Sequence, residues 1–444
     1  MYTLNGCKIG SFTGPPEGIE GDYYSIWADL YSVIASTNNI ITQYEKQKNT
    51  SVEIDQMVGE AYLIRAYCYF RLTRVYKRVV LIDNTDVDYT VGLASVEEIY
   101  EFIKSDLLVA EQVLPENNNS ARVPYMSTHK GVAKAILAEV YISWAGYPLN
   151  NTPKYETAAK TALEVIENAN TYGIGLSDDF ASLWSNTDLY SKESLLTVYF
   201  PYTNSTDVRS SDYLFKTYDD SIHRNKFENQ NFYSTETMFL NTYPNNHRKK
   251  VTFYDTIYHY AVDFSDGEIK RVKEIISIDT VTTCIAMGFH KYYYDLIPMG
   301  EDAISKESFL GSQKLYLFRY AQTLLTYAEA AARSGNLNEK AYDCLNMIRR
   351  RANHVDINAP SVFDIQLGLS AEQFADSVVQ ERAWELAGEP EGRWFDLVRL
   401  EMVEQLPQLR ELDEPGFPNG IPTKDDYFFP IPDDDTNLNP NLKE

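Results

Sequence analysis

The sequence predicts a mainly α-helical protein in which helical hairpins carry a long, loop-rich and partly β insertion. Two observations favour this fold class. Apolar and small residues recur at three- and four-residue steps over 23–170 and again over 318–400, as one face of an α-helix requires. Between these parts, residues 171–317 keep no such period for long and are rich in aromatic and turn-forming residues. We expect a single domain, 1–444, that closes with a loop tail over 401–444.

Composition and charge limit the classes of function and of binding partner that we expect. Acidic residues outnumber basic ones by 64 to 40, a net charge of −24, which argues against nucleic acid or an anionic membrane as a partner. The 44% of hydrophobic residues suffices for a large core, and no apolar run approaches the length of a membrane span. The 34 tyrosines each offer a flat apolar ring with a hydroxyl group, which suits both sugar faces and protein interfaces.

The N-terminal part is expected to contain five amphipathic helices. They are predicted at 23–44, 53–78, about 95–114, about 128–145 and about 155–168. Ser95 followed by Glu98 resembles a capping box, which marks the start of the third helix. The first four helices pair as 23–78 and 95–145, and the sequence does not fix a partner for the fifth.

The clearest hairpin spans 318–352. One face of its first helix is formed by Ala321, Leu324, Leu325, Ala328, Ala331 and Ala332. Gly335 then ends the helix, because glycine adopts the left-handed conformation that closes a helix C-terminus. The unit has about the 34-residue size of a tetratricopeptide repeat, which also relies on small residues where its helices cross. About four tetratricopeptide-like pairs are therefore predicted.

The other elements are less regular. Within 171–317, residues 195–200 read as a strand, and a long insertion of this kind usually carries function. A further helix is expected at about 371–387, where Gly388 and Pro390 end it. The tail after residue 400 is rich in Pro, Asp and Asn and is read as a loop.

Several segments, in chain order, resemble the SusD/RagB family of surface glycan-binding lipoproteins. They are GEAYLIRAYCYF at 59–70, RYA at 319–321 with AEA at 328–330, NMIRRRA at 346–352, ERAWEL at 381–386, GRWFDLVR at 392–399, and PIP at 430–432 with NP at 439–440. The chain departs from the family pattern in the turn at 388–391 and in the segment 76–80 that follows the early helix. The resemblance covers nearly the whole chain.

This resemblance implies both a fold and a function. The fold is one of eight helices in four tetratricopeptide-like pairs beneath an elaborated loop face. The implied function is non-catalytic and needs no cofactor: the protein binds an oligosaccharide at the bacterial cell surface and serves a TonB-dependent outer-membrane transporter. The family's lipid anchor is implied as well. Cys7 lacks the leader of a lipoprotein cysteine, so we expect the signal peptide and anchor cysteine to lie outside the given chain.

The predicted ligand-binding residues lie mostly in the insertion. They are Tyr258, Tyr260, Phe289, Lys291, Tyr292, Tyr294 and Asp295, together with Arg78 after the early helix. Aromatic rings would stack on the apolar faces of sugars while charged side chains bind hydroxyl groups. The run from Tyr292 to Tyr294 is equally consistent with a strand that buries alternate rings, because exposed aromatic patches mark binding sites only as a trend.

Two other classes of function stay open. Glu381 and Glu385 lie one helical turn apart, about 5–6 Å between Cβ atoms, near the roughly 5–5.5 Å carboxyl separation of a retaining glycosidase. Neighbours on a helix point the same way, however, so we favour a structural role in which Arg382, Arg393 and Arg399 neutralise them. The remaining alternative is a helical-repeat scaffold that binds only a protein partner.

No metal site is predicted. Asp433, Asp435 and Asn437 match the first ligand positions of a calcium loop, but Leu438 stands where that loop needs glycine. We read this segment as a solvated terminal loop. His247, His259 and His290 show no metal-ligand spacing, and no catalytic motif is evident.

Overall fold

The structure of this chain is a computed structural model. It describes residues 2–4, 21–47, 51–86, 88, 90–120, 127–184, 190–199, 233–235, 237–253, 256–262, 269–275, 314–409 and 422–443. Most of the undescribed residues fall within the predicted insertion, and the helical parts are described almost completely.

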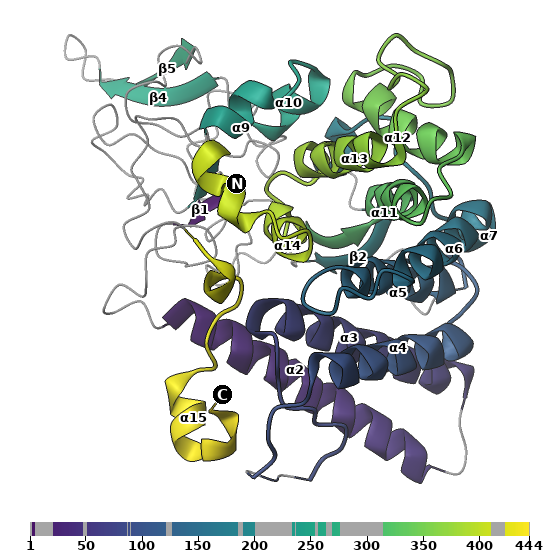
Figure 1. Cartoon of the computed structure of the whole chain (residues 1–444), viewed down its shortest axis with the longest axis vertical. Coiled ribbons are helices and arrows are strands. Elements are labelled where there is room, and N and C mark those ends of the chain that lie inside the picture. Colours follow the sequence, from purple (N-terminus) through teal and green to yellow (C-terminus); the bar gives the residue numbers. More distant parts are fainter. Residues whose placement is uncertain are drawn as a thin grey trace.

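The predicted helical hairpins are present. The helices are α2 (Gly21–Lys46), α3 (Val52–Tyr76), α4 (Val96–Val113), α5 (Lys130–Ala145), α6 (Lys154–Glu167), α7 (Ala169–Tyr172), α11 (Tyr320–Arg333), α12 (Glu339–Ala352), α13 (Ala371–Glu385) and α14 (Arg393–Arg399). Each of the helices from α2 to α6 packs against the next, and α6 then packs against α11, which contacts α12 and α13. The hairpins are thereby stacked one above another in the view of Figure 1. The mainly α fold class is confirmed, and the partner of the fifth helix is α11.

Local sequence signals explain where the helices begin and end. Ser95 accepts from the backbone N–H of Glu98 while the Glu98 carboxylate accepts from Ser95, so the predicted capping box opens α4. Gly335 has a φ of 78°, the left-handed conformation expected after α11. Asn338 then caps α12 by accepting from the Ala341 N–H at 3.0 Å.

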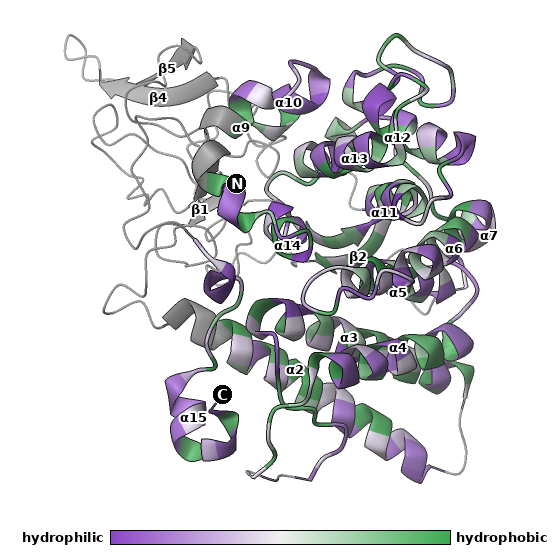
Figure 2. Cartoon of the chain, viewed as in Figure 1, coloured by the Kyte–Doolittle hydropathy of each residue, from purple (hydrophilic) through white to green (hydrophobic). Residues whose placement is uncertain are grey.

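The main core lies between the stacked hairpins. In α11, Ala321, Ala328 and Ala331 are fully or almost fully buried, so the small residues do lie at helix crossings as predicted. Figure 2 shows hydrophobic and hydrophilic residues alternating along the helices, as amphipathic packing requires. None of the described helices combines the length and apolar composition needed to cross a membrane.

A two-stranded sheet closes the base of the insertion. Strand β2 (Ser194–Tyr199) confirms the predicted strand, and it pairs antiparallel with β6 (Lys314–Arg319), which leads directly into α11. The chain therefore leaves the helical part and returns to it at neighbouring points. The described elements between them are β3 (Tyr233–Thr235), α9 (Thr237–Thr242), α10 (His247–Thr252), β4 (Thr256–Val262) and β5 (Ile269–Ile275). β3 pairs with β1 (Tyr2–Leu4).

The C-terminal tail differs from the predicted loop. Its described part contains the short helices η5 (Val403–Leu409), η6 (Lys424–Asp426), α15 (Asp433–Leu438) and η7 (Pro440–Leu442). The three aspartates at the start of α15 favour the helix, because the helix N-terminus carries partial positive charge. Asn439 and Asn441 donate to the carbonyls of Val91 and Thr90 at 2.8 and 2.7 Å, so contacts far away in sequence hold the tail in place.

Candidate functional site

The β4–β5 hairpin carries two of the predicted ligand-binding residues. Tyr258 and Tyr260 are alternate positions of β4 and therefore belong to one face of the ribbon. The register places Tyr258 opposite Lys273 and Tyr260 opposite Arg271. Two aromatic and two cationic positions are thus brought together on one face. In Figure 1 this ribbon lies at the edge of the molecule beside α9 and α10.

Five of the other predicted residues lie in segments that the structure does not describe. Phe289, Lys291, Tyr292, Tyr294 and Asp295 lie outside the described residues, so their place in the site stays a prediction.

Arg78 lies in the turn after α3, where Lys77 has a positive φ of 67°. Its guanidinium donates to the carbonyls of Leu93 and Ala94 at 3.0 and 3.4 Å. The side chain is half-buried. The contacts give Arg78 a structural role in holding the loop before α4.

A buried ion pair ties the insertion to the helical part. Arg248 in α10 has a fully buried side chain and donates to the carboxylates of Glu381 and Glu385 in α13, at 2.7 Å each. In the view of Figure 1, α10 lies between the β4–β5 ribbon and the α12 and α13 helices. The insertion is therefore anchored beside its ribbon by a charged contact that water does not reach.

Two further arginines extend this contact into a network. Arg319, at the end of β6, donates to Glu193 at 2.7 Å, to Glu385 at 2.6 Å and to both oxygens of Glu389. Arg351 in α12 also donates to Glu193 and Glu385. Three arginines and four glutamates from α10, α12, α13 with the turn after it, and the β2–β6 region are thereby joined by ion pairs. Such a network holds these elements in one arrangement, because a buried charge without its partner is costly.

The network decides how Glu381 and Glu385 are to be interpreted. Burial alone would raise the pKa of Glu385, but the arginines, Arg351 first, outweigh it and hold that pKa well below its usual range. A permanently ionised and fully buried carboxylate reaches no sugar. The structural interpretation fits the geometry, but the predicted partners were wrong: Arg248, Arg319 and Arg351 neutralise this pair.

The arginines predicted to neutralise this pair have other partners, and Arg393 donates to the carbonyl of Val379 at 3.3 Å. Arg382 pairs with Glu139 and Asp396. Arg399 pairs with Asp396 and, through two parallel hydrogen bonds, with Glu329. These contacts join α13, α14, α5 and α11, so the last helix is locked to the 393–399 segment as expected, but through different carboxylates.

Comparison with known proteins identifies the family. The sequence model described as the SusD family matches residues 190–444, which is more than half of the chain. The chain belongs to the SusD family. A second family model, described as starch-binding associating with outer membrane, matches residues 16–142. The two matches together cover most of the helical hairpins and of the insertion and leave 143–189 unmatched.

Individual SusD-like proteins resemble the chain over most of its length. SusD-like protein P2 of Formosa agariphila is 24% identical over 98% of this chain and 82% of its own. A SusD superfamily protein of Parabacteroides distasonis has a TM-score of 0.76 at 24% identity, covering 95% of this chain and 84% of its own. A laminarin-binding SusD-like protein has a TM-score of 0.65 at 21% identity, covering 94% and 84%. A protein crystallised with a xylogluco-oligosaccharide has a TM-score of 0.71 at 22% identity, covering 95% and 87%.

Sequence reasoning missed one aromatic pair in this SusD-family chain. Tyr190 is 47% exposed, and its ring lies 6.1 Å from that of Tyr199 in β2. Both residues lie within the insertion, at the sheet of β2 and β6. No local signal indicated it, because Tyr190 stands in a polar segment without periodicity.

One cavity in the described helical part is too small for a sugar. A cavity of about 20 Å³ lies between α3, α4, α5 and α14 and is lined by Arg74, Tyr100, Tyr147 and Phe395, among others. This volume suits about one water molecule. The cavity is therefore unsuited to an oligosaccharide.

The sequence predicted no metal site, and the structure bears on the two groups of residues that were considered. Asp433, Asp435 and Asn437 lie in the helix α15 and not in the loop that a calcium motif needs. His247, however, lies beside Asp179 and His354.

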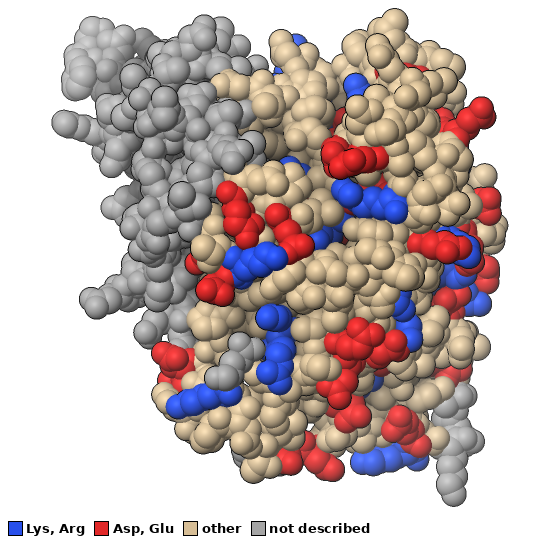
Figure 3. All heavy atoms as spheres, in the orientation of Figure 1, with Lys and Arg blue, Asp and Glu red and all other residues tan. Residues whose placement is uncertain are grey.

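On the face shown in Figure 3, acidic and basic side chains lie beside one another over the described part of the chain.

Proposed function

We propose that this chain is a non-catalytic oligosaccharide-binding protein of the bacterial cell surface, which delivers its glycan to a TonB-dependent outer-membrane transporter. Membership of the SusD family is the observation that carries the proposal. The described association of the family with the outer membrane supports the location. A lipid anchor would hold the protein there.

The proposed sugar site is the ligand face of the insertion. Tyr258 and Tyr260 on β4 would provide stacking surfaces, and Phe289, Tyr292 and Tyr294 would extend them. The hydroxyl groups of the sugar would be bound by Lys291 and Asp295. SusD-like proteins of similar fold that bind laminarin or a xylogluco-oligosaccharide support a glucan as ligand.

The proposed affinity is weak. By analogy with aromatic pairs, a stacked and desolvated ring contributes about 0.5–1.5 kcal/mol beyond its buried area. A few such rings give a dissociation constant in the micromolar-to-millimolar range. Weak binding suits a protein that must release its glycan to a transporter.

The test is calorimetric titration of the purified chain with a panel of oligosaccharides that includes laminarin and xyloglucan fragments. The sugars are analysed by chromatography afterwards. We expect binding of at least one glycan, which is recovered intact. Shortened products would instead indicate a glycosidase, and binding to none of the glycans would favour the protein-only scaffold.

Delivery is tested separately by purifying a tagged, membrane-anchored form from solubilised membranes. We expect a transporter to co-purify, because the handover of a weakly bound glycan requires the two proteins to be in contact. Recovery of the chain alone, under conditions that preserve related complexes, would contradict this step and leave glycan binding unaffected.

A further inference from the structure

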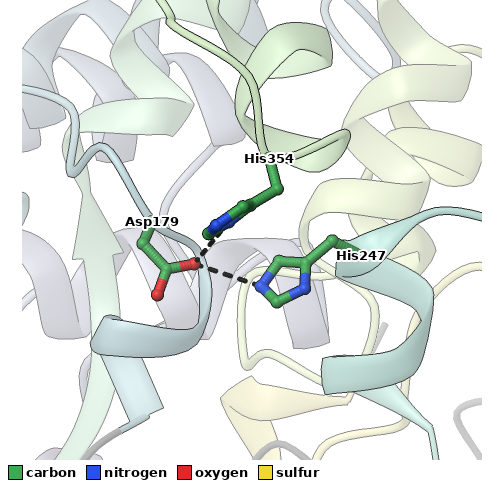
Figure 4. A group of neighbouring side chains, drawn as sticks. All are labelled: Asp179, His247 and His354. Carbon is green, nitrogen blue, oxygen red and sulfur yellow. Dashed lines mark hydrogen bonds and ion pairs between the residues drawn. The ribbon is translucent and has the colours of Figure 1, made fainter.

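Three metal-binding side chains from distant parts of the sequence meet at one point. Figure 4 shows Asp179, His247 and His354 pointing toward one another. The Nε2 atom of His247 lies 3.1 Å from Oδ1 of Asp179, and Nδ1 of His354 lies 3.5 Å from the same oxygen. One ligand atom from each residue can be chosen so that all three lie within 4.8 Å of one another. This cluster has no part in the proposed sugar site.

The backbone holds each of the three residues in place. Asp179 precedes the short helix η1 (Ala181–Trp184), and its Oδ1 accepts from the N–H of Ala181 at 3.1 Å. His247 is the first residue of α10, which Asn246 caps. His354 follows α12 with a φ of 56°, a left-handed conformation that is uncommon for residues other than glycine. The cluster is therefore built from three separately fixed segments.

The separations suit a metal ion. Zinc binds imidazole nitrogen and carboxylate oxygen at about 2.0–2.2 Å, so two ligand atoms on a tetrahedral zinc lie about 3.3 Å apart. The two distances to Asp179, 3.1 and 3.5 Å, bracket this value. Rotation of the exposed His354 ring would close the third edge. Two imidazoles and one carboxylate favour a borderline metal such as zinc over calcium or magnesium.

The surroundings tolerate the added charge. Arg248 and Arg351 lie close in sequence to His247 and His354, but both are neutralised by the buried glutamates. The side chains of Asp179, His247 and His354 are 38%, 27% and 62% exposed. A metal ion can therefore enter from solvent, and water can complete its coordination shell.

We propose that Asp179, His247 and His354 form a zinc-binding site that ties the insertion to the helical part of the protein. Zinc would join α10 to the turn after α12 and to the segment before η1. These elements are adjacent to the buried arginine network, so the metal would reinforce the same junction from the surface. The role is structural, and it stands independently of glycan binding.

The test uses the full chain after treatment with a chelator and dialysis. Zinc chloride is titrated by calorimetry, and thermal unfolding is followed with and without zinc. Two variants remove ligands with little change in shape. Asp179→Asn keeps an acceptor for the Ala181 N–H, and His354→Asn suits the left-handed backbone, which asparagine tolerates. Asp178→Asn is the matched control, because it removes the same charge from an exposed neighbour outside the cluster.

We expect the parent and Asp178→Asn to bind one zinc ion per chain and to unfold at a higher temperature when zinc is present. Asp179→Asn and His354→Asn should bind zinc at least about tenfold more weakly and lose the thermal shift. The proposal is overturned if these two variants bind zinc as tightly as the parent, since the metal would then sit elsewhere. It is equally overturned if the parent shows no binding at millimolar zinc, which would leave only a hydrogen-bonded cluster.

Discussion

Replacing Glu329 by glutamine should destabilise the protein in a way that depends on pH. Glu329 lies in α11 with its side chain fully buried. It accepts two hydrogen bonds from Arg399, at 2.8 and 2.6 Å, and one from Arg333 at 2.8 Å. Burial alone would raise the pKa of Glu329, but Arg399 and then Arg333 outweigh burial and lower the pKa from 4.5 to about 2. Glutamine keeps the size of the side chain and removes its charge.

The pKa shift sets the expected magnitude. A fall from 4.5 to about 2, at about 1.36 kcal/mol per unit, corresponds to about 3 kcal/mol of folding stability. Because the folded-state pKa is the lower one, this contribution is fully present above the unfolded-state pKa. It is lost as the pH falls from 4.5 toward about 2. The estimate agrees with the roughly 3–5 kcal/mol lost when one partner of a buried ion pair is removed.

The assay is urea unfolding of the parent and Glu329→Gln at neutral pH and at a series of acidic values. Glu156→Gln in α6 is the matched control, because Glu156 is exposed and pairs only with Lys160 one turn away. The control should unfold like the parent. Glu329→Gln should be weaker at neutral pH, and the difference should shrink as the pH falls. Equal free energies of unfolding at neutral pH would refute the argument from the ion pair.

Two further substitutions test helix packing. Ala328→Leu adds three carbon atoms at a fully buried position of α11, so we expect a loss of about 1–3 kcal/mol and a lower melting temperature. An unchanged melting temperature would mean that this face does not lie at a crossing. Gly146→Ala would place its Cβ 2.4 Å from the carbonyl oxygen of Arg399, so it should push α5 and α14 apart and lower the melting temperature. Gly175→Ala is the control, because its Cβ would meet only the Lys192 side chain, at 3.7 Å, and we expect the melting temperature of the parent. Equal melting temperatures for these two glycine variants would contradict the close approach.

The sequence predicted the elements whose signals are local. The three- and four-residue period located the helices to within a few residues, and Ser95 with Glu98 located the start of α4. The partner of α6 was not predictable, because α11 lies more than a hundred residues further along the chain. The tail was read as a loop since its short helices depend on contacts such as that of Asn439 with Val91.

Ion pairs across the fold were harder to predict than the residues that form them. The motifs that resemble the SusD family include Arg319, Arg351, Glu381 and Glu385, all of which belong to the buried network. The sequence reveals only which residues are close along the chain, so it pointed to Arg382, Arg393 and Arg399 as partners. The true partners come from other elements that tertiary packing brings together. The four residues of the family motifs therefore belong to the structural frame of the protein.

The residues of the candidate sites were also predictable only where they are close in sequence. Tyr258 and Tyr260 were predicted from the clustering of aromatic residues, whereas the strand that places both positions on one face was not predicted. Asp179, His247 and His354 come from three segments, and no motif joins them in sequence. Local composition therefore indicated the two tyrosines but neither the ribbon that carries them nor the histidine cluster.

The most direct test of the central claim is the affinity for a bound glycan after Tyr258 and Tyr260 are both replaced by alanine, with the melting temperature measured alongside. Each ring should contribute about 0.5–1.5 kcal/mol, so the double variant should bind about 5- to 150-fold more weakly while melting like the parent. Tyr44→Ala, on the distant helix α2, should keep the parent's affinity. A double variant that melts like the parent and binds the glycan equally well would contradict the claim that the insertion is the ligand face.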